Sequence, residues 1–255
     1  MAKLGSLSQW ALNFSDANWS KINQNLSGFA LNDLGDVVTS AKELRNCLDK
    51  VIYSAEYKIR RPRIDTRLFN TSADTVWSWR PELWCGPIGK KGRVGVKSGL
   101  KLGQEVSIFH DCELQEISMR QVRNTRRDDL APFGFVMDIY NFEGTFFSVA
   151  IDFPDDAIAN MSTRHIVLME TRIQSDKPLE IFGRLNVRHG PNVEHIVRPL
   201  FIDDNMVMIE FDLGYLRLNQ KRIGQVWLDL IFSEPAMNQI KISDISFYRR
   251  PRAEF

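Results

Sequence analysis

The segment 226–232, with the sequence VWLDLIF, decides the fold of this chain. Its residues alternate between the two sides of an extended backbone: Trp227, Asp229 and Ile231 face one way, and Val226, Leu228, Leu230 and Phe232 face the other. Such alternation predicts a β-strand with one face in a core. Similar runs, each ended by turn residues, occur at residues 146–153, 165–173, 179–188, 194–202, 207–213 and 240–248.

The first half of this region carries weaker strand patterns. They lie at residues 93–96, 106–110, 116–123 and 133–142, and Glu143-Gly144 predicts a hairpin turn after the last of them. The long helices that would join parallel strands are absent from the pattern. The sequence therefore predicts a mainly β fold, an antiparallel jelly-roll β-sandwich over residues 63–255.

Residues 1–62 predict a helical N-terminal arm. The strongest helical pattern covers residues 36–58, with Asp36 as N-cap and Pro62 barring continuation. Apolar residues repeat at spacings of three and four: Leu34, Val37, Ala41, Leu44, Leu48, Val51 and Ala55. Three interpretations stay open for residues 34–55: packing on the chain's own domain, self-association into a homo-oligomer, and contact with a membrane surface.

The charges nearly cancel, with 33 Lys and Arg against 32 Asp and Glu and a net charge of +1. This balance provides no overall field to attract nucleic acid, so no nucleic-acid partner is expected. Basic clusters at residues 58–63, 123–127 and 249–252 are interpreted as solvated loops and domain ends. No apolar run approaches the roughly 18 residues of a membrane span, so no transmembrane segment is predicted.

The cysteines Cys47, Cys85 and Cys112 are odd in number and form no CxxC pair. This pattern favours neither a redox motif nor a zinc knuckle, and it suits a reducing compartment. The first ten residues, MAKLGSLSQW, lack the continuous apolar stretch of a secretory signal. We therefore expect a cytoplasmic protein; a surface or particle-associated location is the alternative for a protein released without a signal peptide.

Several segments together resemble an uncharacterised bacterial family, a domain of unknown function. They are WSWRPELWCGPI (77–88), IFHDCELQEISMRQVRN (108–124), LEIFGRLNVRHGPN (179–192), WLDLIF (227–232) and ISFYRRPRAEF (245–255). This resemblance implies no catalytic residues. The order of the C-terminal strands is also similar to that of galactose-binding-like and carbohydrate-binding jelly rolls, which implies a binding role.

Two groups of residues are candidates for ligand binding. Trp77, Trp79 and Trp84 offer aromatic rings that would stack on a sugar or join a protein interface, with core packing as the alternative. Residues 179–188 alternate, so that Glu180, Arg184, Asn186 and Arg188 share a strand face with Phe182. That face could bind hydroxyl groups, or it could form cross-strand ion pairs on a wet surface.

Metal binding is considered for His110, His189 and His195, with Asp111 and Cys112 beside the first of them. Asp155-Asp156 and Asp203-Asp204 are weak candidates for calcium. The spacings match no known ligand pattern. We therefore expect no metal and no cofactor.

No catalytic motif is present: GxSxG, GxGxxG and GxxxxGK[ST] are all absent. The sequence favours a non-catalytic binding module that recognises carbohydrate or a glycan-bearing surface. A structural or assembly protein, joined to a protein partner or oligomerised through the N-terminal helices, is the first alternative. The second is a sugar-acting hydrolase, which would need two carboxylates facing each other in a cleft.

Overall fold

The computed structural model describes residues 19–60, 74–126, 128–202 and 206–252. The chain divides into two compact units, Met1–Leu48 and Asp49–Phe255. The predicted boundary between residues 62 and 63 falls in the segment 61–73, outside the described residues.

The N-terminal helix is longer than its pattern predicted. Residues 19–24 are helical, η1 covers Leu26–Gly28, and the 30-residue helix α2 covers Leu31–Arg60. The prediction of Asp36 as N-cap is wrong, because the helix begins five residues earlier and carries Asp33 in its first turn, where a carboxylate stabilises the positive end of the helix dipole. Among the described helices, none has the length and apolar character to cross a membrane.

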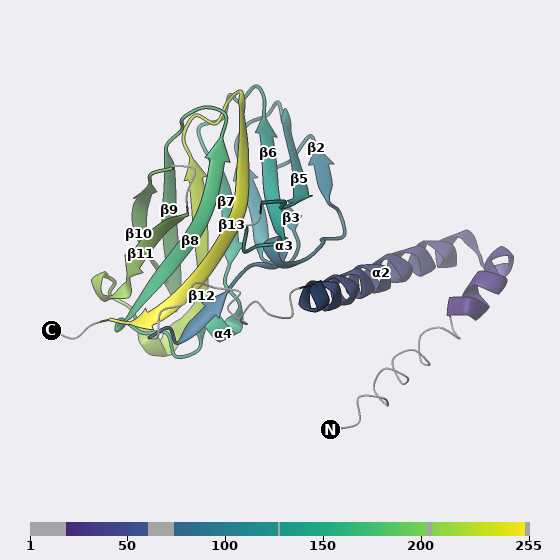
Figure 1. Ribbon diagram of the computed structural model, residues 1–255, viewed down its shortest axis with the longest axis horizontal. Helices are drawn as coiled ribbons and strands as arrows, with labels where there is room; N and C mark the ends of the chain where they lie inside the picture. The colour runs from purple at the N-terminus through teal and green to yellow at the C-terminus, as the bar shows by residue number, and fades with distance from the viewer. Residues whose placement is uncertain (1–18, 61–73, 127, 203–205, 253–255) are drawn as a thin grey trace. The chain divides into compact units, whose positions relative to one another are not determined.

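Two antiparallel sheets form the predicted sandwich (Figure 1). The seven-stranded sheet has the order β11 (Val207–Asp212), β8 (His165–Ser175), β13 (Asn238–Pro251), β6 (Phe133–Ile139), β5 (Ile117–Arg123) and β2 (Gly92–Val94), with β1 (Trp77–Trp79) also paired to β13. The six-stranded sheet has the order β10 (Asn192–Leu200), β9 (Ile181–His189), β12 (Ile223–Phe232), β7 (Phe147–Asp152), β4 (Val106–His110) and β3 (Leu100–Leu102).

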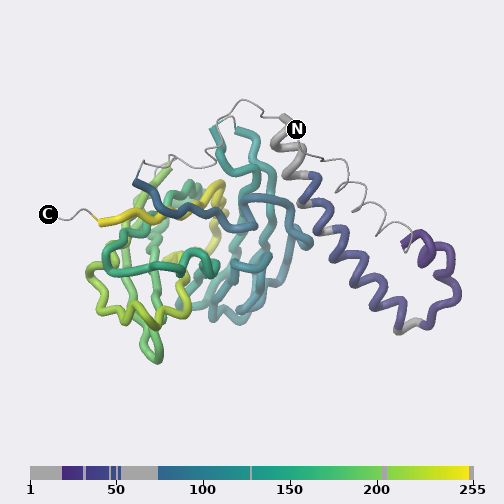
Figure 2. The backbone as a smooth tube through the Cα atoms, turned by 90° about the horizontal axis from the view of Figure 1, so that it is seen from below, coloured from purple at the N-terminus to yellow at the C-terminus, as the bar shows by residue number. Residues whose placement is uncertain are grey.

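Most successive strands belong to different sheets, as in a jelly roll. Figure 2 views the sandwich from below, roughly along its strands, with the chain passing repeatedly between the two layers. Single turns of helix occupy some of the connections: α3 (Glu82–Cys85), α4 (Asp155–Ile158), η2 (Leu213–Tyr215) and η3 (Gln220–Arg222).

The strands predicted from alternation are confirmed within a few residues, but the hairpin predicted at Glu143-Gly144 is wrong. The strands that flank it, β6 and β7, lie in different sheets, so the loop crosses the end of the sandwich instead of reversing within a sheet. The Asp111 carboxylate fixes this crossing, because it accepts hydrogen bonds from Thr145 N (2.8 Å), Thr145 Oγ1 (2.6 Å) and Phe146 N (3.1 Å). The short strands β1 and β3 were not predicted.

The core lies between the sheets, where alternate residues of every long strand meet. In β12, Val226, Leu228 and Leu230 are completely buried, as the alternation of this segment predicted. The largest side chains of this core are Trp84, Phe135, Phe147, Phe211, Phe232 and Phe247. Burial of this much apolar surface is the main force that holds the two sheets together.

Candidate functional site

The outward side of the six-stranded sheet carries polar and apolar side chains on regular strands. Strand register places on it, from the central strands, Gln225, Trp227, Asp229 and Ile231 of β12 and Phe182, Arg184, Asn186 and Arg188 of β9. The neighbouring strands add Val193, His195, Val197 and Pro199 of β10, Ser148, Ala150 and Asp152 of β7, and Ser107 and Phe109 of β4. We call this surface the Trp227 face.

A nearly buried carboxylate stands at the centre of the Trp227 face. Asp229 Oδ2 accepts hydrogen bonds from Arg184 Nε (3.1 Å), Arg184 Nη2 (2.9 Å) and Asn186 Nδ2 (2.9 Å). The Asp229 side chain is only 7% exposed, whereas that of Arg184 is 43% exposed. These charge-assisted bonds hold the Asp229 carboxylate in a fixed orientation close to the sheet. The Arg184 guanidinium that binds it is partly exposed to solvent.

Trp227 lies directly beside this cluster. It stands opposite Asn186 in the strand register, and its side chain is half-buried. The Arg188 guanidinium carbon lies 5.7 Å from the centroid of the Trp227 ring, within the range of a cation–π contact. Gln225 Nε2 donates to Asp152 Oδ1 (3.3 Å) at the next position along β12.

Exposed apolar side chains surround the polar centre. Phe109, Val193 and Val197 are each more than two-fifths exposed on β4 and β10. A surface that combines an aromatic ring, fixed polar groups and exposed apolar side chains is typical of a binding site.

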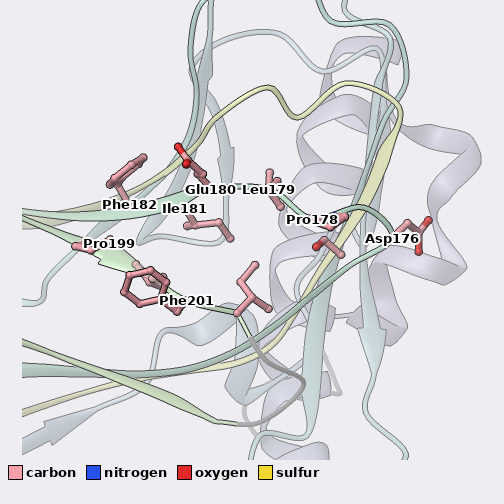
Figure 3. Close-up of a pocket in the computed structure, with 11 residues that line it drawn as sticks. Asp176, Pro178, Leu179, Glu180, Ile181, Phe182, Pro199 and Phe201 are labelled. Atoms are coloured by element: carbon pink, nitrogen blue, oxygen red, sulfur yellow. The ribbon is translucent and has the colours of Figure 1, made fainter.

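The polar residues predicted from strand alternation are brought together only in part. Arg184, Asn186 and Arg188 meet around Asp229 and Trp227, as described above. Glu180 lies one residue before β9, at the end of the sheet, where it lines a hollow of about 760 Å³ (Figure 3). Its carbonyl oxygen accepts a hydrogen bond from Ser233 N (3.0 Å), so Glu180 belongs to the loops and not to the polar centre.

The three predicted tryptophans do not form a binding surface together. Trp84 is 0% exposed and its Nε1 donates to Ile242 O (2.9 Å), so the prediction that it stacks on a ligand is corrected: the ring fills the core. Trp77 and Trp79 share one side of β1, with ring centroids 6.2 Å apart. Both are half-buried and pack against Phe153, which fits the core-packing alternative.

The three histidines do not lie together. His110 on β4 and His189 on β9 face the core from opposite ends of the six-stranded sheet, three strands apart, while His195 is exposed on β10. These three candidates therefore do not share one site in the described structure. Within the part of the chain that the structure describes, no three His, Cys, Asp or Glu residues are grouped as metal ligands. Asp203-Asp204 lies outside the described residues.

The C-terminal basic cluster has partners within the protein. Arg249 Nη1 donates to Ala157 O (2.6 Å), Arg250 pairs with Glu210 (2.9 Å), and Arg252 pairs with Asp212 (3.1 Å). These arginines stabilise the end of the seven-stranded sheet. Cys47, Cys85 and Cys112 are free thiols, and only Cys112 is buried.

A carboxyl group with a raised pKa is one mark of a catalytic acid. Burial raises the pKa of Asp244 above its ordinary value of 3.8, and the Arg80 guanidinium opposes this shift. Arg80 Nε and Nη2 bind the two Asp244 oxygens at 2.9 and 3.0 Å inside the seven-stranded sheet. This carboxyl group is sequestered from any substrate, so it serves the fold.

Sequence reasoning missed Trp227 and Asp229 as site residues. Alternation in 226–232 already placed both on the side away from the core. Only the pairing of β12 with β9, about 40 positions away in the chain, joins them to Arg184 and Asn186. The signal in the sequence that could have identified this site was Asp229, a charged residue in the middle of an apolar strand.

Solved structures with similar folds include carbohydrate-binding modules. The family 11 module from Clostridium thermocellum, in complex with a β-1,3-1,4-mixed-linked tetrasaccharide, is 10% identical, covers 62% of this chain and 96% of its own, and has a TM-score of 0.38. The CBM22-1 xylan-binding domain from Paenibacillus barcinonensis Xyn10C is 9% identical, covers 67% of this chain and 98% of its own, and has a TM-score of 0.36.

The enzymatically active domain of bacteriophage CBA120 tailspike protein 4 is 7% identical, with 56% of this chain covered and a TM-score of 0.40; this chain spans only 19% of that one. No curated protein matches in sequence. The resemblance to a family of unknown function is confirmed, because the model described as "Family of unknown function (DUF6478)" matches residues 1–255. The chain belongs to this family.

Proposed function

We propose that the sandwich binds carbohydrate on the Trp227 face, without chemical change to the sugar. The observation that carries this proposal is the Asp229 carboxylate held by Arg184 and Asn186 beside the half-buried ring of Trp227. Sugars present apolar C–H faces and hydroxyl edges. An aromatic ring next to fixed planar polar groups complements both.

The polar groups are oriented before any ligand arrives. All three hydrogen bonds that the Arg184 and Asn186 side chains donate to Asp229 end on Oδ2, which leaves its other oxygen as an acceptor for a ligand. Because these side chains are already held, binding a hydroxyl group would require little further ordering. This arrangement supports a binding role for Asp229, beyond cross-strand pairing alone.

The dimensions of the face suit a polysaccharide chain better than a single sugar. Six neighbouring strands spaced about 4.8 Å apart make a surface roughly 24 Å wide. Exposed side chains on both β4 and β10 extend the contact surface to either side of Trp227. Arg188 adds a positive charge that would favour uronic acid units.

Native gel electrophoresis through dissolved polysaccharide tests this proposal. The panel would be a neutral β-glucan, xylan, a galactan and polygalacturonate. We expect at least one to retard the full chain, and Trp227→Ala and Asp229→Asn to weaken that retardation by about tenfold in affinity, as for central contact residues. Tyr215→Ala is the matched control, because Tyr215 is an exposed aromatic residue outside the face.

Retention of full retardation in Trp227→Ala would contradict the proposed site. Absence of retardation by every polysaccharide would contradict the proposed function. Urea unfolding of each variant shows whether a lost signal reflects lost folding. If only polygalacturonate binds, Arg188→Ala is expected to remove most of the affinity.

A second candidate function, assembly, is favoured by helix α2. Its apolar repeat continues over the described side chains, and Leu48 and Val51 of that repeat are more than half exposed. A second copy of the same helix would cover this seam in a coiled coil. Light scattering would then give a mass above the 29.5 kDa of one chain.

Two double variants are compared in this measurement. Leu44→Glu with Leu48→Glu places charges on the apolar seam, and Thr39→Glu with Lys42→Glu is the control outside the seam. Charges on the seam are expected to return the protein to one chain, whereas charges at exposed polar positions leave the mass unchanged. A full chain that already weighs 29.5 kDa excludes self-association through α2.

A further inference from the structure

One end of the sandwich gathers five loops, at residues 111–116, 140–146, 176–180, 201–202 and 233–237, and the connection 95–99 between β2 and β3 lies beside them. It is the upper end in Figure 1, where β8 finishes and β13 starts, opposite α4. We call it the loop end. It is distinct from the Trp227 face, which runs along the strands.

Backbone hydrogen bonds join these loops into one surface. Met237 N donates to Tyr140 O (2.7 Å), and Tyr140 N donates to Glu116 O (3.0 Å). Ser233 N donates to Glu180 O (3.0 Å), which links the loop 233–237 to the loop 176–180. The loop end is therefore a built structure with several mutual contacts.

Large apolar side chains are exposed on every one of these loops except 176–180. Phe201 is 81% exposed and Met237 61% exposed. Leu114, Tyr140 and Phe146 are each more than two-fifths exposed. Exposed apolar side chains that gather in one region are typical of interaction sites.

Two hollows open between the loops. The larger, of about 760 Å³, lies between Pro178, Leu179, Phe182, Pro199 and Phe201 (Figure 3). The other, of about 490 Å³, is lined by Phe142, Phe146, Phe232 and Pro235 among others. Each has the size to receive a side chain from another molecule, and each is lined by both apolar and polar groups.

The backbone of the loop end is strained. Gln115 (φ 53°), Glu234 (φ 48°) and Met237 (φ 52°) occupy the left-handed region, and they are three of the four non-glycine residues that do so in the described chain. Such a backbone conformation is unfavourable for a residue with a side chain, and it persists only where the surroundings impose it. Strain of this kind is concentrated at functional sites.

The charge of the loop end is strongly negative. Seven exposed carboxylates lie on these loops: Asp111, Glu113, Glu116, Glu143, Asp176, Glu180 and Glu234. Lys177 is the single basic residue on these five loops in the described chain, and Lys97 lies on the neighbouring connection 95–99. Such a surface repels anionic membranes and anionic sugars, and it attracts cationic segments.

We propose that the loop end docks a protein partner through a basic segment with an apolar or aromatic anchor. The anchor enters a hollow beside Phe201 or Phe146, and Lys or Arg on either side face the ring of carboxylates. Apolar anchors supply the affinity of such contacts, and the complementary charges supply specificity and rate of association.

Surface plasmon resonance with the full chain immobilised tests the proposal. Three sets of short synthetic peptides serve as probes. The first set has a Phe, Leu or Trp anchor flanked by Lys and Arg, and the second has the same anchors flanked by Glu and Asp. The third set has Lys and Arg among Ser and Gly, without an apolar anchor. We expect binding by the first set alone. Phe201→Ser with Met237→Ser is expected to weaken it by about tenfold or more.

Val76→Ser with Tyr215→Ser is the matched control, because both side chains are exposed near the opposite end of the sandwich. Charge reversal by Glu180→Lys with Glu234→Lys should also weaken binding and remove its dependence on salt. Equal binding of the acidic peptides, full binding by the Phe201 and Met237 variant, or no binding by any set overturns the proposal.

Vesicles of phosphatidylcholine with phosphatidylserine form a further arm, and binding to them in place of the basic peptides overturns the proposal as well. The Phe201 and Met237 variant should keep its retardation in polysaccharide gels. That result separates failure at the loop end from failure at the Trp227 face.

Discussion

At the scale of single residues, the candidate site depends on one polar residue in an apolar strand. Asp229 would be costly to bury alone, and Arg184 and Asn186 satisfy it across the β9–β12 pair. The sequence pattern of β9 was enough to predict that Arg184, Asn186 and Arg188 share a face. It could not identify their partner, because strand pairing is a long-range property.

Asp111 gives a prediction on stability against pH. Hydrogen bonds from Thr145 and Phe146 lower the pKa of this exposed carboxyl group from 3.8 to about 2. Because the pKa is lower in the folded state, the contribution to stability is complete above pH 3.8 and is lost as the pH falls toward 2. We expect Asp111→Asn to be less stable than the natural chain at neutral pH, and the two to converge over that acidic range.

Urea unfolding midpoints measured across the pH range check this expectation. Glu113→Gln is the control in the same loop, and it should change stability little, as most surface substitutions do. A constant gap between the natural chain and Asp111→Asn down to pH 2 would show that the difference in stability does not come from the ionised carboxylate.

At the scale of elements, alternation predicted the strands well, and failures occurred where tertiary contacts override local pattern. Residues 207–213 and 226–232 became β11 and β12 almost as expected. The hairpin at Glu143-Gly144 failed because turn propensity cannot distinguish a reversal within a sheet from a crossing between sheets. Helix α2 began before Asp36 because several polar residues in this region could equally begin it.

The buried ion pair between Arg80 and Asp244 joins the segment after β1 to β13. Their side chains are 2% and 4% exposed, so removal of one partner leaves an uncompensated charge in the interior. Asp244→Ala is expected to lower the free energy of unfolding by about 3–5 kcal/mol, the usual loss for half of a buried pair.

Urea unfolding again provides the measurement. Arg120→Ala is the control, because Arg120 pairs with Asp138 at the surface with its side chain 46% exposed. An exposed pair is worth at most about 1 kcal/mol. Similar losses for the two variants would show that burial does not set the strength of the Arg80–Asp244 pair.

At the scale of the whole molecule, the sandwich carries two separate surfaces. The Trp227 face combines an aromatic ring with a fixed polar cluster along the strands, and the loop end combines apolar side chains with carboxylates. The fold class was predictable from the sequence because strand alternation repeats along the chain. The surfaces were not, because each is assembled from segments far apart in the sequence.

The most direct test of carbohydrate binding on the Trp227 face uses the indole N–H signals of the six tryptophans in an NMR spectrum of the full chain. Trp227→Phe identifies the signal of Trp227. When a polysaccharide of the panel is added, we expect the Trp227 signal to move while that of Trp84, bonded to Ile242 O in the core, stays fixed. Movement confined to Trp77 and Trp79, or no movement with any polysaccharide, would contradict the account.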